Sequence, residues 1–120
     1  MRVLLVDDST TMRKIQRRLL SGLGCNDVLE AGNGKEAMTV LENFDFEFDL
    51  VLCDMNMPEM NGIETLTAIR AVTKKLPVVM CTSVAEKSAV MEAIRNGANN
   101  YLVKPFAQDV FIAKIKPFLS

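Results

Sequence analysis

Five short apolar runs, separated by segments with helical periodicity, constrain the fold of this chain more than any other feature. The runs cover residues 3–6, 28–31, 50–53, 78–81 and 101–103. The first, third and fourth are apolar at almost every position instead of every second one, which is typical of parallel strands covered by helices on both faces. The sequence therefore predicts a five-stranded parallel sheet with helices on each side.

Apolar residues at three- and four-residue spacing follow each predicted strand, which is typical of amphipathic helices. In chain order these sets are Met12, Ile15 and Leu19; Ala37 and Leu41; Ile63, Leu66 and Ile69; Val90 and Ile94; and Phe111, Ile115 and Phe118. Gly22 and Gly24 are predicted to end the first helix and Gly97 the fourth, because glycine readily takes the left-handed conformation at helix ends. We expect residues 1–120 to form a single (βα)5 domain of the α/β class.

Composition excludes several classes of function. The chain has no histidine, which rules out Ser-His-Asp and Cys-His catalysis and imidazole metal ligation. Its three cysteines include no CxxC pair and so predict neither a disulfide framework nor a zinc site. The net charge of −1 favours no nucleic-acid partner. Because the apolar runs are too short for a signal peptide or a membrane span, we expect a cytoplasmic protein without membrane insertion.

Polar side chains follow four of the predicted strands: Asp7 and Asp8, then Asp54, then Thr82 and Ser83, and finally Lys104. Ligands of open α/β sheets bind beyond the carboxyl ends of the strands, so these groups are expected to converge. Three carboxylates would repel one another by about 1 kcal/mol per pair at 4 Å in bulk water. Lys104 supplies one compensating charge, and an oxygen-rich cluster suits Mg²⁺.

Some of these residues have simpler interpretations. Asp8 could cap the first helix and Thr82 the fourth, and Tyr101 could be an ordinary strand aromatic. Cys53 and Cys81 directly precede two site residues, so strand alternation points them away from the site and into the core. The basic residues Arg13, Lys14, Arg17 and Arg18 are interpreted as a solvated helix face, with a docking patch for an acidic partner as the alternative.

Four segments together resemble the receiver domains of bacterial response regulators, and among them the stand-alone receivers of chemotaxis. They are VDDS at 6–9, DMNMPEMNG at 54–62, MCTS at 80–83 and NNYLVKPF at 99–106. The resemblance covers the whole chain. It implies a doubly wound, flavodoxin-like (βα)5 fold with the strand order 2-1-3-4-5.

The resemblance also implies a phosphoacceptor and a metal site. Asp54 is expected to accept the phosphoryl group. Asp8 and Asp54, together with the backbone carbonyl of Asn56, are expected to bind Mg²⁺ directly, and Asp7 through a water molecule. Mn²⁺ is an expected substitute for Mg²⁺.

Further positions match the parts of receivers that sense the phosphoryl group. Thr82, Ser83 and Lys104 are expected to contact it, and Tyr101 occupies the position of an aromatic switch residue. The peptide bond between Lys104 and Pro105 is expected to be cis. The sequence departs from chemotaxis receivers at Met55 and Val84, which are expected to border the phosphoryl group and to influence its lifetime.

The implied function is that of a single-domain response regulator, a phosphoacceptor switch and not an enzyme with a separate substrate. A sensor histidine kinase would supply the phosphoryl group. The surface of the fourth helix, fifth strand and fifth helix would then bind a target such as the flagellar motor switch. A phosphatase is a further expected partner. No output domain is expected. The chain is expected to be a monomer. The alternative is a phosphorelay shuttle with a target outside motility.

Other functions on the same fold fit less well. A flavin or nucleotide binder needs a Ser-, Thr- or Gly-rich loop after the first strand, where this chain has two anions. A phosphatase with an Asp nucleophile needs a second Asp two residues later, where Asn56 stands. A receiver that no longer takes phosphate is disfavoured by the intact acidic set and Lys104.

Overall fold

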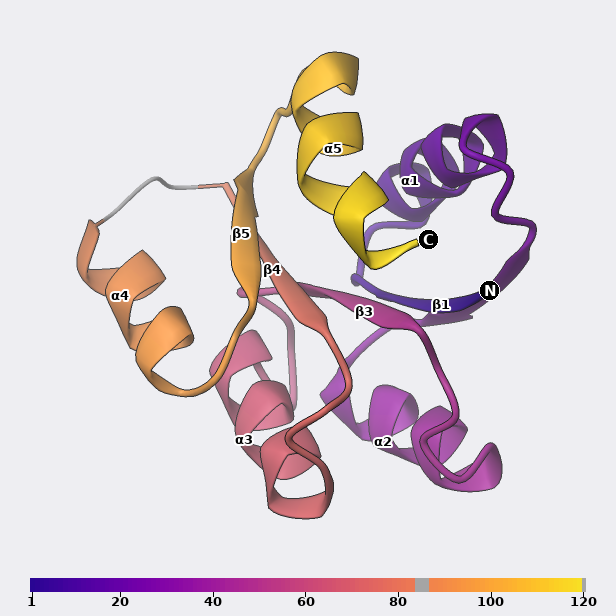
Figure 1. Ribbon diagram of the computed structural model, residues 1–120. Coiled ribbons are helices and arrows are strands. Elements are labelled where there is room, and N and C mark those ends of the chain that lie inside the picture. The colour runs from indigo at the N-terminus through magenta and orange to yellow at the C-terminus, as the bar shows by residue number, and fades with distance from the viewer. Residues whose placement is uncertain (84–86, 120) are drawn as a thin grey trace.

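The computed structural model describes residues 1–83 and 87–119 (Figure 1). Strands and helices alternate along these residues. The elements are β1 (Arg2–Val6), α1 (Thr10–Gly22), β2 (Asp27–Ala31), α2 (Gly34–Asn43), β3 (Leu50–Asp54), α3 (Gly62–Val72), β4 (Val78–Thr82), α4 (Lys87–Arg95), β5 (Asn100–Val103), α5 (Gln108–Ile115) and a 3-10 turn, η1 (Lys116–Phe118). The predicted (βα)5 pattern is confirmed, with strand bounds that differ by one residue at most at each end.

The strands form one parallel sheet in the order β2-β1-β3-β4-β5. The order expected from the resemblance is therefore confirmed. β1 lies beside β3, and Val6 pairs with Cys53, so the residues that follow these two strands meet at one edge of the sheet. β2 lies on one side of β1, and β3, β4 and β5 follow in turn on the other side, so the strand order reverses at β1. Ligands of such folds bind at the point where the strand order reverses.

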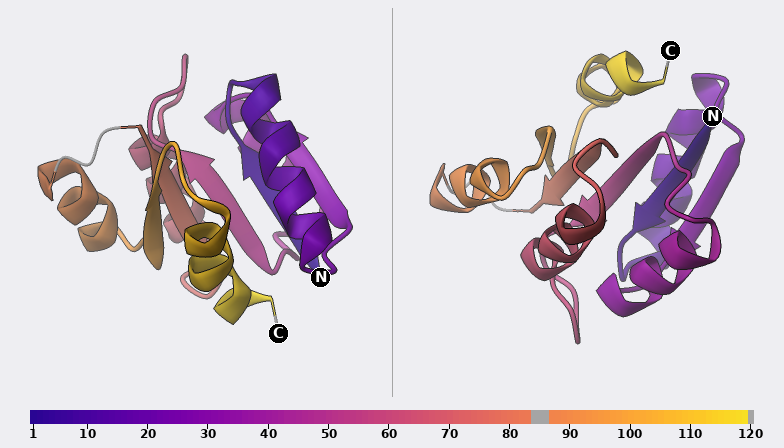
Figure 2. Two further views of the ribbon diagram at one scale, coloured as in Figure 1. Left: turned by 90° about the horizontal axis from the view of Figure 1, so that it is seen from above. Right: turned by 60° about the horizontal axis from the view of Figure 1, so that its bottom comes forward.

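Helices cover both faces of the sheet (Figure 2). On one face, Leu41 of α2, Leu66 of α3 and Ala93 of α4 pack in the same core. On the other face, Leu20 of α1 and Phe111 of α5 belong to a second core. Successive residues of β1 point alternately into the two cores, as the continuous apolar runs predict. Among the described residues, no helix is both long and apolar enough to cross a bilayer.

The buried face of α1 differs from the prediction. Gln16 and Leu20 are buried, whereas Ile15 is 40% exposed. The amide of Gln16 donates to the Cys81 sulfur at 3.9 Å. Helix residues four apart lie on one face, so packing against the sheet places Gln16 beside Leu20 despite its polarity. The apolar spacing of Met12, Ile15 and Leu19 therefore does not mark the most deeply buried face of this helix.

The fourth helix shows a similar difference. Ala93 is buried, whereas Ile94 is 45% exposed and Met91 is 49% exposed. The apolar spacing of Val90 and Ile94 therefore does not mark the buried face of this helix. α4 packs on the sheet through the small Ala93, whereas Met91 and Ile94 remain at the surface.

The last predicted helix ends earlier than its apolar spacing indicates. α5 ends at Ile115, and Phe118 belongs to the 3-10 turn η1. Pro117 lacks the amide hydrogen that an α-helix would need there, so the backbone tightens into the short 3-10 turn.

Gly62 lets the start of α3 approach the backbone beside Asp54. A methyl group at Gly62 would lie 2.3 Å from the Asp54 carbonyl oxygen and 2.7 Å from the Met55 Cα. Because these are backbone atoms, they cannot move aside without distorting the loop. We expect Gly62→Ala to lower the free energy of unfolding by about 1 to 3 kcal/mol, measured by urea denaturation. Gly22→Ala is the matched control, because a methyl group there meets no atom within 4 Å. Equal stability of the two variants would contradict this explanation.

Candidate phosphorylation and metal site

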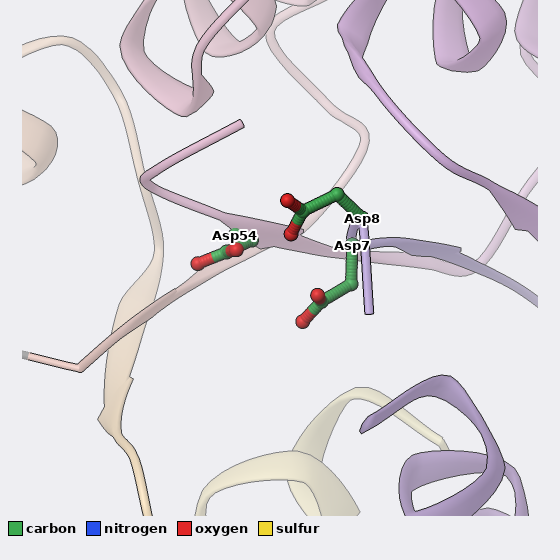
Figure 3. Close-up of side chains that lie close together, drawn as sticks. All are labelled: Asp7, Asp8 and Asp54. Atoms are coloured by element: carbon green, nitrogen blue, oxygen red, sulfur yellow. The ribbon is translucent and has the colours of Figure 1, made fainter. Parts of the chain in front are cut away.

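Three carboxylates lie close together beyond β1 and β3 (Figure 3). Asp7 and Asp8 directly follow β1, and Asp54 is the last residue of β3. One oxygen from each carboxylate lies within 4.8 Å of the other two. Asp7 and Asp54 are buried, whereas Asp8 is exposed. The fold thus brings together the three acids that the sequence singled out.

Lys104 supplies the positive charge of this cluster. Its Nζ lies 2.6 Å from Asp7 Oδ2 and 3.4 Å from Asp54 Oδ1. The Lys104 amide donates to the Thr82 carbonyl oxygen at 2.6 Å, which ties the lysine to the end of β4. The peptide bond to Pro105 is cis, as expected. The positive charge of Lys104 therefore lies close to the negative charges of both Asp7 and Asp54.

Burial and charge set the proton affinities of the cluster. Burial raises the pKa of the Asp54 carboxyl above its ordinary value; the charge of Lys104 opposes this rise and that of Asp7 adds to it. Burial alone would lower the pKa of Lys104, but its hydrogen bond to Asp7 and the charges of both aspartates outweigh burial and raise the pKa. Lys104 is therefore a cation at neutral pH.

Local contacts orient Asp7. Its Oδ1 accepts a hydrogen bond from the Ser9 amide at 2.9 Å, and the Arg13 guanidinium donates to its main-chain carbonyl. Ser9, and not Asp8, caps α1, since its side chain accepts from the Met12 amide at 3.1 Å. The cap interpretation of Asp8 was therefore wrong. The sequence reasoning missed Ser9, although serine before an amphipathic segment is a recognised cap signal.

The loop after Asp54 is held by backbone hydrogen bonds. The Met55 amide donates to the Cys81 carbonyl at 2.9 Å, and the Gly62 amide donates to the Met55 carbonyl at 3.0 Å. The Asn56 amide lies 3.5 Å from Asp54 Oδ1, a long contact. These bonds fix the turn that carries Asn56 beside the acidic cluster.

The remaining predicted residues lie at the ends of β4 and β5. Thr82 is the buried last residue of β4, pairs with Val103 and is followed by the exposed Ser83. The described part of α4 begins at Lys87, and the residues between Ser83 and Lys87 lie outside the described residues, so the interpretation of Thr82 as a helix cap stays untested. Tyr101 is half-buried on β5. Val84 lies outside the described residues.

Both cysteines next to the site are core residues, as predicted. Cys53 and Cys81 are buried and belong to opposite cores. Burial raises the pKa of both thiols, that of Cys81 to about 12. Neither thiol therefore ionises near neutral pH.

Half of the basic cluster on α1 is engaged within the molecule. Arg13 and Arg17 both bind the Glu30 carboxylate on β2, at 2.7 Å and 2.6 Å. The interpretation of the cluster as a solvated face was therefore wrong for Arg13, whose side chain is only 17% exposed, whereas Arg17 is exposed as well as paired. Lys14 and Arg18 are exposed, as that interpretation predicts.

The donor set fits Mg²⁺. All three side chains offer carboxylate oxygens, the ligand type this ion prefers, and Asp8 is accessible to solvent. Mg²⁺ usually takes few protein ligands and retains several waters. A cation would also compensate the negative charge that Lys104 leaves on the cluster.

Comparison with known families places the chain in a class. Residues 3–116 match the response regulator receiver domain. The chain belongs to this family and is a CheY-like receiver of two-component signalling. The family predicted from the four sequence segments is therefore confirmed.

Similar proteins include chemotaxis receivers from several bacteria. A chemotaxis protein CheY homolog of Campylobacter jejuni is 42% identical over 122 residues, which cover 100% of this chain and 93% of the relative. Chemotaxis protein CheY1 of Helicobacter pylori strain J99 is 43% identical over 123 residues, with 100% and 98% coverage. The solved structure of Vibrio cholerae chemotaxis protein CheY4 has a TM-score of 0.86 and 30% identity, covering 98% of this chain and 97% of that one.

Proposed function

We propose that this receiver is a switch that a sensor histidine kinase controls by phosphorylating Asp54. The carrying observation is the buried Asp54 carboxylate, which lies 3.4 Å from Lys104 in a cluster with two further acids. A carboxylate beside a fixed cation, at the carboxyl edge of a parallel sheet, suits phosphoryl transfer because positioning and charge neutralisation are its main requirements.

In the proposed transfer, a carboxylate oxygen of Asp54 attacks the phosphorus of a phosphohistidine. A P–O bond forms, the P–N bond breaks, and the leaving imidazole nitrogen keeps the electron pair and takes a proton. Lys104 neutralises a phosphoryl oxygen as the group arrives. Thr82 and Ser83, at the end of β4, donate hydrogen bonds to the bound group.

The proposed metal ligands are the side chains of Asp8 and Asp54, the backbone carbonyl of Asn56 and, through water, Asp7. Bound Mg²⁺, or Mn²⁺ in its place, supplies charge neutralisation for the transferring phosphoryl oxygens. The chain's own contribution is to orient Asp7 through Ser9 and to keep its carboxylates within reach of one ion.

The proposed output surface combines α4, β5 and α5. Met91 and Ile94 expose apolar side chains on α4, and Tyr101 is half-buried on β5. An exposed apolar pair on the helix that precedes β5 is suited to contact with a partner protein. We propose that the chain acts in the cytoplasm as a monomeric single-domain regulator, whose activated state a phosphatase could reverse.

The proposed target is the flagellar motor switch, because several relatives are named chemotaxis proteins. Capture with beryllofluoride, a mimic of the phosphoryl group, tests this. Recovery of a motor-switch protein would support the proposal, whereas recovery of a histidine phosphotransfer protein would favour a phosphorelay shuttle.

The central experiment is labelling by a small phosphodonor. The purified chain, incubated with acetyl phosphate, should shift on a Phos-tag gel when Mg²⁺ is present and remain unshifted when EDTA replaces the metal. Base or hydroxylamine should reverse the shift, because an acyl phosphate is labile to both. A label that resists both reagents would contradict an aspartyl phosphate.

The metal site predicts a specific thermal response. Mg²⁺ that binds the folded cluster and not the unfolded chain should raise the melting temperature in a saturable way. Asp8→Asn should weaken this response, because it removes a ligand, while raising the melting temperature without metal by relieving carboxylate repulsion. Asp109→Asn, an exposed change on α5, is the matched control and should respond like the wild type. An unaltered Mg²⁺ response in Asp8→Asn would place the metal elsewhere.

A further inference from the structure

Lys114 on α5 makes two contacts with Tyr101 on β5. Its Nζ donates a hydrogen bond to the Tyr101 carbonyl oxygen at 2.8 Å and lies 4.1 Å from the centroid of the Tyr101 ring. A cation at this distance over an aromatic ring is attracted by the ring electrons. One side chain thus holds both the main chain and the ring of Tyr101.

Lys114 and Tyr101 contact each other at the edge of the sheet. Among the described strands, β5 lies at the end of the order and pairs with β4 alone. Leu102 packs in one core with Phe111 and Ile115 of α5. Strand alternation therefore places the Tyr101 side chain on the opposite face from α5. Lys114 reaches from the α5 side to a ring on the other side.

We infer that Lys114 is a positioning residue, which favours the half-buried position of the Tyr101 ring over a fully buried one. The inference rests on the proposed switch role of Tyr101. A ring that turns into the protein must leave the ammonium group or draw it into less polar surroundings, and both changes are unfavourable. Loss of Lys114 should therefore make the phosphoryl-bound conformation easier to reach.

A simpler role for Lys114 is to interact with the C-terminal end of the α5 dipole. Lys116 shares that role, because it is the C-cap of the same helix, and it is exposed. Lys116→Met therefore removes the same charge at the same helix end and is the matched control. Lys114→Arg retains a cation that can stack on the ring and should preserve the contact.

Tyrosine fluorescence reports on this ring alone, because the chain has one tyrosine and no tryptophan. Each protein is titrated with beryllofluoride at a fixed Mg²⁺ concentration. We expect the half-maximal fluorescence change of Lys114→Met at about a two- to fivefold lower beryllofluoride concentration than in the wild type, the effect of losing a partly exposed cation–π contact. Lys114→Arg and Lys116→Met should follow the wild type.

A second measurement needs no phosphoryl mimic. Acrylamide quenches exposed tyrosine, so a ring that spends more time buried is quenched less. In the free proteins we expect weaker quenching for Lys114→Met than for the wild type, and no such change for Lys116→Met. This comparison reports on the contact even if Asp54 proves not to be the phosphoacceptor.

Unchanged midpoint and quenching in Lys114→Met would overturn the inference, as would a higher midpoint. If Lys116→Met showed the same shift, the effect would come from loss of positive charge at the C-terminal end of α5, and the inference about Lys114 would also be overturned. If beryllofluoride did not change the tyrosine fluorescence of the wild type although Asp54 still became labelled, the switch role of Tyr101 and this inference would both be overturned. If Asp54 did not become labelled, the result would instead contradict the assignment of Asp54 as the phosphoacceptor.

Discussion

Asp54→Asn is expected to abolish Mg²⁺-dependent labelling of this chain by acetyl phosphate. The amide has almost the same shape as the carboxylate but lacks its negatively charged nucleophilic oxygen. Because the pKa of Asp54 is raised in the folded protein, its ionised form destabilises the metal-free fold at pH values above that pKa. The variant should therefore melt at an equal or higher temperature than the wild type without metal, so that lost labelling cannot be ascribed to unfolding.

The control for this variant is Asp109→Asn, the same chemical change at an exposed position on α5. It should become labelled like the wild type on a Phos-tag gel. If Asp54→Asn retained full labelling, the phosphoacceptor would have to be another carboxylate.

Thr82→Ala is expected to accept phosphate on Asp54 and yet to bind its target poorly. Thr82 is buried at the end of β4, and its partner strand β5 carries Tyr101 two residues before Val103. A hydrogen bond to a charged group contributes about 1.5 to 3 kcal/mol. A phosphoryl group can shift the switch only by its different affinity for the two states. Losing this bond should therefore weaken target binding by about tenfold or more.

Binding of the phosphorylated proteins to the captured target, measured by titration calorimetry, tests the role of Thr82. Thr39→Ala is the matched control, because that threonine is exposed on α2 and donates only to the Lys35 carbonyl among the bonds of the described residues. Full target affinity of phosphorylated Thr82→Ala, together with an unchanged Tyr101 fluorescence response, would show that the signal takes another route.

The sheet was the most predictable part of this protein. Its strands are apolar throughout because both faces are covered, and that pattern needs no tertiary information. The order of the strands came from family resemblance, since hydrophobic spacing does not say which strands are neighbours. The close approach of Asp7, Asp8 and Asp54 followed from their places after strands that end at the same edge.

Helix faces and fine contacts were less predictable. Ile15 and Ile94 are more hydrophobic than Gln16 and Ala93, yet the structure buries the latter pair. Which face of a helix is buried depends on its packing against side chains from elements distant in sequence, and hydrophobic spacing within one helix does not include that information. The pairing of Arg13 and Arg17 with Glu30 was missed for the same reason, because it joins α1 to a neighbouring strand.

The ion pair between Lys104 and Asp7 joins the last strand of the sheet to the first, across 97 positions of the chain. During synthesis, the acidic residues leave the ribosome long before the lysine that compensates them. A nascent chain that ends before β5 therefore carries Asp54 without Lys104 and without the strand that bears Tyr101. If phosphoryl transfer to Asp54 uses Lys104 as proposed, we expect a nascent chain to become competent for it only after residue 104 has been synthesised.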